Sequence, residues 1–248
     1  MYPTHVALAC LVRSTCINAA MTARGMQQIG MAFVLSPALR YLYPEPAAQN
    51  ATFARYNGPT NTHPFMLPLF AGIVLSLEEA VAEGSLPVAS VNAIRETLAT
   101  SLSALGDAFF SGTLLPLWAL TCINLLLCGY MSLALLCTAI LFLAQLLFRA
   151  YTFFYGLRLG MTALVHLRQL NGINWAGRLK LINAVLTVLL IWQLPPSHIH
   201  PFPWSDAALD VLAMLAAAWL VDRMHLPRIV LWAMVLCVIL MDLDIIGM

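Results

Sequence analysis

Six polar residues within one apolar stretch of the sequence are the strongest candidates for chemistry. They border two short apolar runs: Asn61, Thr62, His63, Glu78, Glu79 and Asp107. An ionisable residue inside a membrane segment costs at least about 2.5 kcal/mol, so it is a functional candidate by default. Carboxylates and amides accept or donate hydrogen bonds in pairs, which matches the hydroxyl groups of a sugar. The pattern therefore predicts a polar binding site for a polyhydroxylated solute.

The two apolar runs that position these residues are Phe65–Leu77, which ends on Glu78, and Leu98–Leu105, which ends on Gly106 and Asp107. A helix needs about 20 residues to cross the hydrocarbon core, and a run of about 10–14 is typical of buried or re-entrant segments. Backbone that breaks at membrane depth requires protein or a watery cavity to satisfy it. We therefore predict two re-entrant hairpin arms within residues 61–116. The alternative is that the acids simply end helices at the water surface.

An enzyme is the competing class, with His63 as a base and Glu78 as the acid that orients it. The sequence contains no G-x-S-x-G, H-E-x-x-H or phosphate-loop motif to accompany them. Its six cysteines lack metal-ligand spacing and are interpreted as buried thiols. His198 and His200 could bind a metal, but a solvated loop is the favoured interpretation. We expect no cofactor and no independent catalysis.

The composition defines the class of protein. Of the 248 residues, 61% are hydrophobic and 9% are charged, whereas soluble domains carry roughly 25% charged residues. The sequence therefore predicts an integral membrane protein. A formal net charge of +1 leaves no basic face for a nucleic acid. No cleavable signal peptide is expected, because Arg13 follows the first apolar stretch instead of preceding it.

The N-terminal region mixes apolar and cationic residues. Between Cys10 and Leu39 this mixture suits an amphipathic helix in the membrane interface, and a core-facing helix fits equally well. Pro37 and the run Tyr41–Pro46 are predicted to stop this helix. Few acids balance the arginines before Glu78, which favours a cytoplasmic N-terminus.

The C-terminal half reads as transmembrane helices. Trp118–Phe148 contains no charged residue and is interrupted by Gly129, so it fits one kinked span or two partly dipping segments. Residues 149–180 carry only basic charges and predict a second cytoplasmic stretch. A short apolar run, Leu181–Leu194, precedes a predicted helical hairpin over residues 207–241. One membrane domain results: an interfacial region 1–60, the hairpin arms 61–116 and the helices 117–248.

The order of these motifs resembles the IID membrane component of the mannose/fructose/sorbose family of sugar phosphotransferase systems. The matching motifs are Arg13-Ser14, Met26-Gln27 with Gly30, Pro37-Ala38-Leu39, Leu42-Tyr43-Pro44, Asn61-Thr62-His63-Pro64, Leu77-Glu78-Glu79, Gly106-Asp107, Gly112-Thr113, Pro116, Gly156-Leu157 and the hairpin around Arg223–Ile246. The resemblance covers nearly the whole length of the chain.

The resemblance implies a multi-pass subunit of the bacterial cytoplasmic membrane that pairs with a IIC subunit. The two would bind a hexose, which a IIB partner phosphorylates with phosphate that a IIA subunit supplies. The IID subunit would carry no phosphorylated residue, and IIC–IID pairs would assemble into a higher oligomer. Carried over by motif, Asn61, Thr62, His63, Glu78, Glu79 and Asp107 are expected at or near the sugar path.

The sequence departs from the family pattern in two motifs of this region. The Gly-Pro-x-x-Gly run of the family begins here with Thr100-Ser101 and ends on Ala104, and a family arginine is replaced by Leu115. A methyl group at Ala104 adds bulk where two backbones pass closely. These departures support an alternative, in which the chain is a structural or regulatory subunit that binds a IIC partner without moving sugar.

Overall fold

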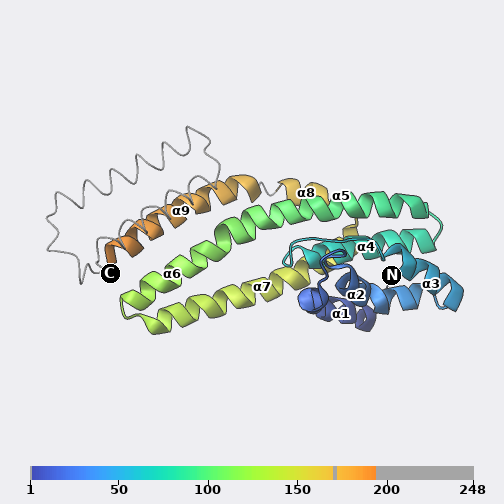
Figure 1. Ribbon diagram of the computed structural model, residues 1–248, viewed down its shortest axis with the longest axis horizontal. Helices are drawn as coiled ribbons and strands as arrows, with labels where there is room; N and C mark the ends of the chain where they lie inside the picture. The colour runs from blue at the N-terminus through green and yellow to red at the C-terminus, as the bar shows by residue number, and fades with distance from the viewer. Residues whose placement is uncertain (1, 170–171, 194–248) are drawn as a thin grey trace, which may run out of the picture. The chain divides into compact units, whose positions relative to one another are not determined.

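The computed structural model describes residues 2–169 and 172–193, and this part of the chain is helical (Figure 1). It contains three helices that are long and apolar enough to cross a membrane: Val88–Leu127, Met131–Leu159 and Asn174–Gln193. The predicted all-helical class is confirmed for these residues. The predicted C-terminal hairpin, with His198 and His200, lies outside the described residues.

The N-terminal region forms two helices in place of one. Helix α1 (Thr4–Arg13) continues into the 3-10 helix η1 (Ser14–Ala20), and α2 (Gln28–Leu42) begins after a break at Met26, whose φ is 52°. Helix α2 packs against α1 and has five hydrophobic residues with no exposed surface: Met31, Val34, Leu35, Ala38 and Leu39. Much of α2 therefore behaves as the core-facing alternative.

Pro37 does not stop α2, which runs on to Leu42. A proline inside a helix removes the N–H that would bond to the carbonyl four residues earlier, here that of Phe33. Two side chains donate to the Phe33 carbonyl oxygen in its place: Ser36 Oγ at 2.9 Å and Arg13 Nη1 at 3.3 Å. The helix continues because this orphaned acceptor is satisfied from outside the helical ladder.

Helix α4 (Leu67–Ala82), which follows the short α3 (Pro46–Arg55), forms the centre of the hydrophobic core. Most of its side chains are buried on every face, which is typical of a core helix. It packs closely on α7 (Met131–Leu159) through two glycines. A Cβ on Gly156 would lie 2.7 Å from the Leu69 carbonyl oxygen, and one on Gly72 would collide with the Phe153 carbonyl. Small residues allow this approach of two helix backbones.

Helix α5 (Val88–Gly106), the π-helical segment η2 (Asp107–Leu114) and α6 (Leu115–Leu127) form one continuous helix of 40 residues. A turn after Ala82 connects α4 to α5, and these two helices pack together as a hairpin. The predicted end of the second arm at Gly106–Asp107 is wrong, because the helix passes through both residues. The wider turn of η2 lies directly before Pro116, where a regular helix would meet a steric clash.

Helices α6 and α7 form a helical hairpin that turns at Gly129, whose φ is 81°. Trp118–Phe148 is therefore not one kinked span, because it consists of a helix, a tight turn and a second helix. Helix α9 (Gly172–Gln193) follows the short α8 (Thr162–Gln169) and packs against α6 and η2. Asn124 of α6 donates to the Leu186 carbonyl oxygen at 3.2 Å and accepts from Gln193 Nε2 at 2.8 Å.

Candidate functional site

The segment Thr60–His63, which carries three of the predicted site residues, is held in an extended conformation by Gln27. The Gln27 backbone N–H donates to the Thr60 carbonyl oxygen at 2.8 Å. Its buried side-chain amide accepts from the Thr62 N–H and donates to the Thr62 carbonyl oxygen, both at 2.9 Å. These hydrogen bonds resemble those between two β-strands. They fix the backbone at Thr60 and Thr62, and with it the position of Asn61 and His63.

His63 connects this segment to η2. Its Nδ1 accepts from the Phe65 N–H at 3.3 Å, so in the neutral ring Nε2 carries the proton and donates to Ser111 Oγ at 3.0 Å. The ring stacks on Phe110, and Gly106 packs so closely that a Cβ there would collide with it. Burial lowers the pKa of His63, although the charge of Asp107 opposes this shift. His63 is therefore a neutral hydrogen-bonding group near pH 7.

Segment η2 places Asp107 and Ser111 one turn apart on an exposed surface. π-Helical turns are rare and are frequently found at functional sites. From the other side, Asn183 of α9 donates to the Thr113 carbonyl oxygen at 3.0 Å. The segment thus contacts both the His63 loop and a candidate membrane span.

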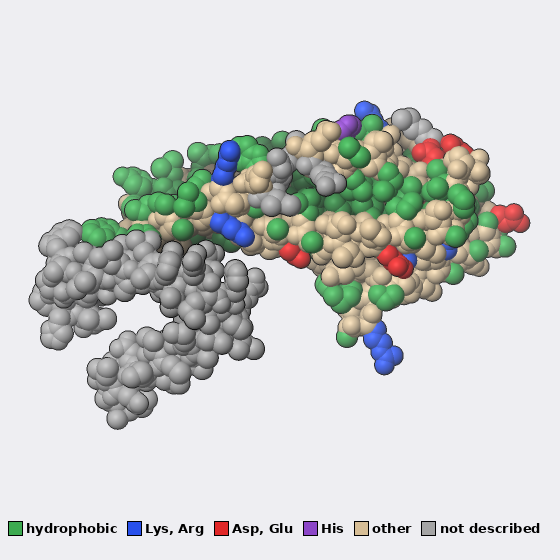
Figure 2. Space-filling view, turned by 90° about the horizontal axis from the view of Figure 1, so that it is seen from above, with side chains coloured by type: hydrophobic (Ala, Val, Ile, Leu, Met, Phe, Trp, Pro, Cys, Tyr) green, Lys and Arg blue, Asp and Glu red, His purple; other side chains and the backbone are tan. Residues whose placement is uncertain are grey.

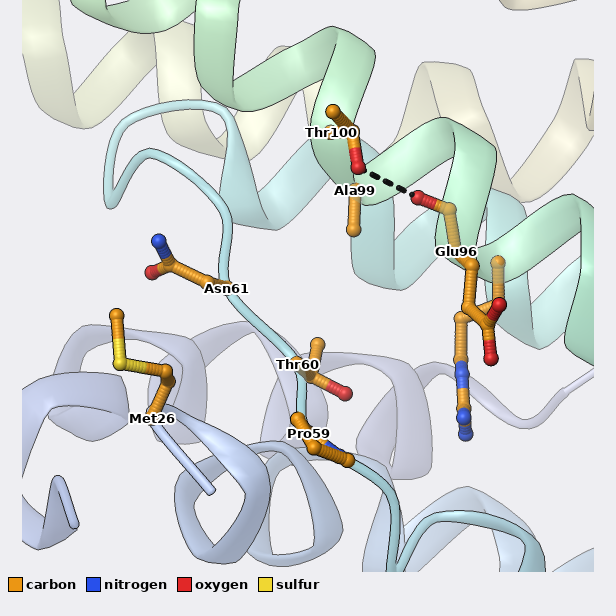
Figure 3. A pocket seen from close by; sticks show the side chains of 8 residues that line it. Met26, Pro59, Thr60, Asn61, Glu96, Ala99 and Thr100 are labelled. Atoms are coloured by element: carbon orange, nitrogen blue, oxygen red, sulfur yellow. Dashed lines mark hydrogen bonds between the residues drawn. The ribbon is translucent and has the colours of Figure 1, made fainter. Parts of the chain in front are cut away.

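A cavity of about 200 Å³ lies between residues 59–61 and α5 (Figure 3). Figure 3 shows Thr60 and Asn61 on the extended segment, opposite Glu96 and Thr100 on neighbouring turns of the helix. The cavity is lined by Met26, Pro59, Thr60, Asn61, Arg95, Glu96, Ala99 and Thr100. Arg95, Glu96 and Thr100 were not predicted from the sequence as site residues, although the spacing of four between Glu96 and Thr100 is a signal for a shared helix face.

Glu78 lies elsewhere, in a fully buried cluster. Its carboxylate accepts from Tyr56 Oη at 2.6 Å, from Tyr43 Oη at 2.9 Å and from Arg55 Nη2 at 2.6 Å. Burial raises the pKa of Tyr56 well above its ordinary value, and the charge of Glu78 adds to this effect, so the phenol remains a donor. The oxygens of Glu78 are thus occupied by its own chain.

The predicted site residues fall into two groups at opposite ends of α4. His63 and Asp107 interact near the beginning of α4. Glu78 lies 15 residues after His63 in the sequence, which corresponds to about 22 Å along a helix. Glu79 is half-buried near Tyr2, where burial and then the charge of Glu79 raise the pKa of the phenol. Within residues 2–169 and 172–193, no group of three or more His, Cys, Asp and Glu side chains could hold a metal ion.

Comparison with known proteins places this arrangement in a family. The family model "PTS system mannose/fructose/sorbose family IID component" matches residues 4–194. The mannose-specific EIID component of Escherichia coli K12 is 31% identical over 151 residues, which cover 60% of this chain and 52% of that protein. The sorbose-specific EIID component of Klebsiella pneumoniae is 28% identical over 184 residues, which cover 74% and 66%, respectively. The chain spans about half the length of the Escherichia coli relative.

Two solved structures share the fold. A cryo-EM structure of the mannose transporter ManYZ with microcin E492 has a TM-score of 0.53 at 23% identity, covering 100% of this chain and 98% of the other. A second structure, described as a membrane protein, has a TM-score of 0.68 at 23% identity and covers 96% and 95%. Because the family model extends over most of the sequence, this chain belongs to the IID components of the mannose/fructose/sorbose phosphotransferase family.

Proposed function

We propose that this chain forms, together with a IIC membrane subunit, the path by which a hexose crosses the bacterial cytoplasmic membrane. A IIB partner phosphorylates the sugar, and a IIA subunit supplies the phosphate. The chain itself contributes no catalytic or phosphorylated residue. IIC–IID pairs assemble further into a higher oligomer.

One observation carries this proposal, namely a polar stripe on the exposed side of α5 and η2. The stripe consists of four polar residues, Glu96, Thr100, Asp107 and Ser111, with the small Ala104 between them, and all five are exposed. Their spacing of three or four residues places them on one helix face. The 15 residue-to-residue steps from Glu96 to Ser111 correspond to about 22 Å along the helix.

The stripe differs from the surfaces of the other candidate spans. Large hydrophobic side chains are exposed on α6, α7 and α9, whereas the described residues 89–122 expose none. Figure 2 shows hydrophobic side chains at the end that holds the α6–α7 turn and also across the rest of the visible face. A surface of large apolar side chains suits lipid, and a surface of carboxylates and hydroxyls suits water and a polar solute.

The predicted site residues relate to this stripe in different ways. Asn61 lines the cavity beside it, His63 bonds to Ser111, and Asp107 is part of the stripe. Thr62 fixes the segment that carries them. We place these four residues on the sugar path. Glu78 and Glu79 do not belong to the stripe; both lie near the C-terminal end of α4. Glu78 there holds α3 against the core through its bond with Arg55.

In the hairpin of α4 and α5, the short arm α4 is proposed to enter the membrane without crossing it, whereas α5 continues through η2 into the candidate span that ends at Leu127. Helix α4 has the short apolar sequence that such an arm needs, and its burial within the protein satisfies the condition for irregular backbone at membrane depth. The polar stripe on α5 would then meet the IIC subunit and the solute.

Uptake in cells that lack their own mannose-family transporter tests this function. The chain is co-expressed with the IIC and soluble subunits of its own genome, and accumulation of labelled mannose, fructose, sorbose and glucose is measured. We expect uptake of at least one sugar, and its loss with Asp107→Asn while the protein remains in the membrane. Normal uptake with Asp107→Asn would show that Asp107 does not contact the transported sugar. No uptake by the wild type would contradict the function.

A second candidate function is a structural or regulatory subunit that binds a IIC partner without moving sugar. The replacements at Thr100-Ser101, Ala104 and Leu115 favour it. Thermal unfolding of the purified IIC–IID pair discriminates between the two functions. Stabilisation of the pair by a hexose counts against the regulatory role, and co-purification of the pair without such an effect or uptake supports it.

A further inference from the structure

We propose that the cavity between residues 59–61 and α5 is a subsite that binds hydroxyl groups of a hexose through Arg95, Glu96 and Thr100. This inference rests on the proposed function, because a sugar must reach the polar stripe to enter the cavity. It assigns binding roles to three residues of α5 that the family motifs in the sequence did not single out.

Arg95 is a buried cation among the residues that line this subsite. The residue is only 4% exposed, and its Nη1 donates to the Arg55 carbonyl oxygen at 2.7 Å. Its guanidinium lies 5.2 Å from the centre of the Tyr56 ring. The ion pair found in the described part of the chain joins Arg55 to Glu78 and leaves Arg95 without a carboxylate at that distance. A guanidinium has five N–H donors, so one carbonyl leaves donors available for a ligand in the cavity.

Glu96 and Thr100 supply the acceptors. The Thr100 hydroxyl donates to the backbone carbonyl of Glu96 at 3.0 Å, which leaves its oxygen available to accept a hydrogen bond (Figure 3). The carboxylate of Glu96 accepts from up to two neighbouring hydroxyls, and the amide of Asn61 both donates and accepts. This mixture matches a group that donates and accepts at every position, as a sugar hydroxyl does.

The charge balance selects a neutral ligand. Arg95 and Glu96 bring opposite charges to the lining of one cavity. A phosphate would be attracted by the guanidinium and repelled by the carboxylate, and a cation would experience the reverse. A neutral polyol gains hydrogen bonds from both groups without either penalty. Met26, Pro59 and Ala99 give the cavity apolar surface for the C–H groups of a sugar ring.

A pair of threonines on α5 provides a matched test. Thr97 and Thr100 are both exposed, and each donates its hydroxyl to the carbonyl oxygen four residues earlier, Thr97 at 3.1 Å and Thr100 at 3.0 Å. Only Thr100 lines the cavity. Valine has nearly the same shape as threonine, so either substitution removes a hydroxyl with little effect on packing.

The experiment measures the dissociation constant of a labelled hexose for the purified IIC–IID pair. We expect Thr100→Val to raise it roughly fivefold to tenfold, which is the effect of one lost hydrogen bond, and Thr97→Val to leave it unchanged. Glu96→Gln should raise it by about tenfold or more, because a charged acceptor is lost. The control for this variant is Glu83→Gln, an exposed glutamate in the turn before α5 that does not line the cavity.

The outcomes separate this subsite from the function on which it rests. Equal dissociation constants for Thr97→Val and Thr100→Val, or no hexose binding by the wild-type pair, would overturn the subsite. If the wild-type pair binds hexose through Thr100 but cells accumulate none, the subsite stands and the transport function fails. Uptake by the wild type with unchanged binding in Thr100→Val preserves the function and refutes the subsite.

Discussion

Glu78→Gln is expected to destabilise the protein strongly, although the substitution changes a single atom. The wild-type carboxylate has no exposed surface, and it accepts hydrogen bonds from Tyr43, Arg55 and Tyr56. The amide keeps the shape but removes the charge, so Arg55 loses its ion-pair partner and one tyrosine meets an N–H donor. Loss of one partner from a buried ion pair costs about 3–5 kcal/mol of folding free energy. For a chain of this size, that corresponds to a fall in melting temperature of roughly 6–20 °C.

The assay heats the detergent-purified chain to a series of temperatures. Size-exclusion chromatography then measures the fraction that remains folded, which gives the melting temperature. Glu83→Gln serves as the control, because Glu83 is exposed one turn later and should melt with the wild type. In the double variant Arg55→Met/Glu78→Gln the loss should be smaller than the sum of the two single losses, since the orphaned cation has been removed. A Glu78→Gln protein that melts together with Glu83→Gln would refute the interpretation of Glu78 as a structural anion.

Two further predictions concern His63 and the core. Because burial holds the pKa of His63 below its ordinary value, the folded state binds fewer protons than the unfolded state below about pH 6.5. The melting temperature should therefore fall as the pH drops below 6.5, and His63→Asn should flatten this part of the profile; an unchanged slope would contradict the assignment. Gly72→Ala should lower the melting temperature, because the added methyl collides with α7, whereas Gly177→Ala meets no atom within 4 Å and should be tolerated. Equal melting temperatures of the two alanine variants would argue against the close crossing of α4 and α7.

The sequence predicted the elements that are determined by a few neighbouring residues. The first apolar run, Phe65–Leu77, lies largely within α4, which is the short apolar helix that the run predicted. The apolar stretch after Trp118 lies within two helices that are long and apolar enough to cross a membrane, and Gly129 marks the turn between them. Each signal is a property of a few neighbouring residues.

The helix breaks could not be predicted with the same success, because proline and glycine act through their surroundings. Pro37 is accommodated because Arg13, from a different helix, donates to the carbonyl that the proline leaves unsatisfied. Gly106 lies inside a continuous helix instead of ending it. A glycine is required there because any side chain would collide with His63, which belongs to the loop before α4. Ser36, next to the proline, donates to the same carbonyl, but Arg13 and His63 are distant in the sequence from the residues that they affect.

The grouping of the candidate site residues also depends on distant partners. Glu78 binds side chains 22–35 residues earlier in the sequence, and those partners made its structural role invisible to motif analysis. Arg95 was overlooked because a lone arginine in a polar interval gives no local signal for burial. Its contact with the Arg55 carbonyl joins residues 40 positions apart.

The central claim is that the stripe on α5 and η2 faces water and sugar, whereas the surface of α7 faces lipid. A single cysteine at Ala104 or at Leu135, introduced after replacement of the six native cysteines, tests it in membranes that contain the IIC partner. A charged, membrane-impermeant maleimide should label Ala104→Cys, a transported hexose should slow this labelling, and Leu135→Cys should remain unlabelled. Labelling of Leu135→Cys with an unreactive Ala104→Cys would contradict the account.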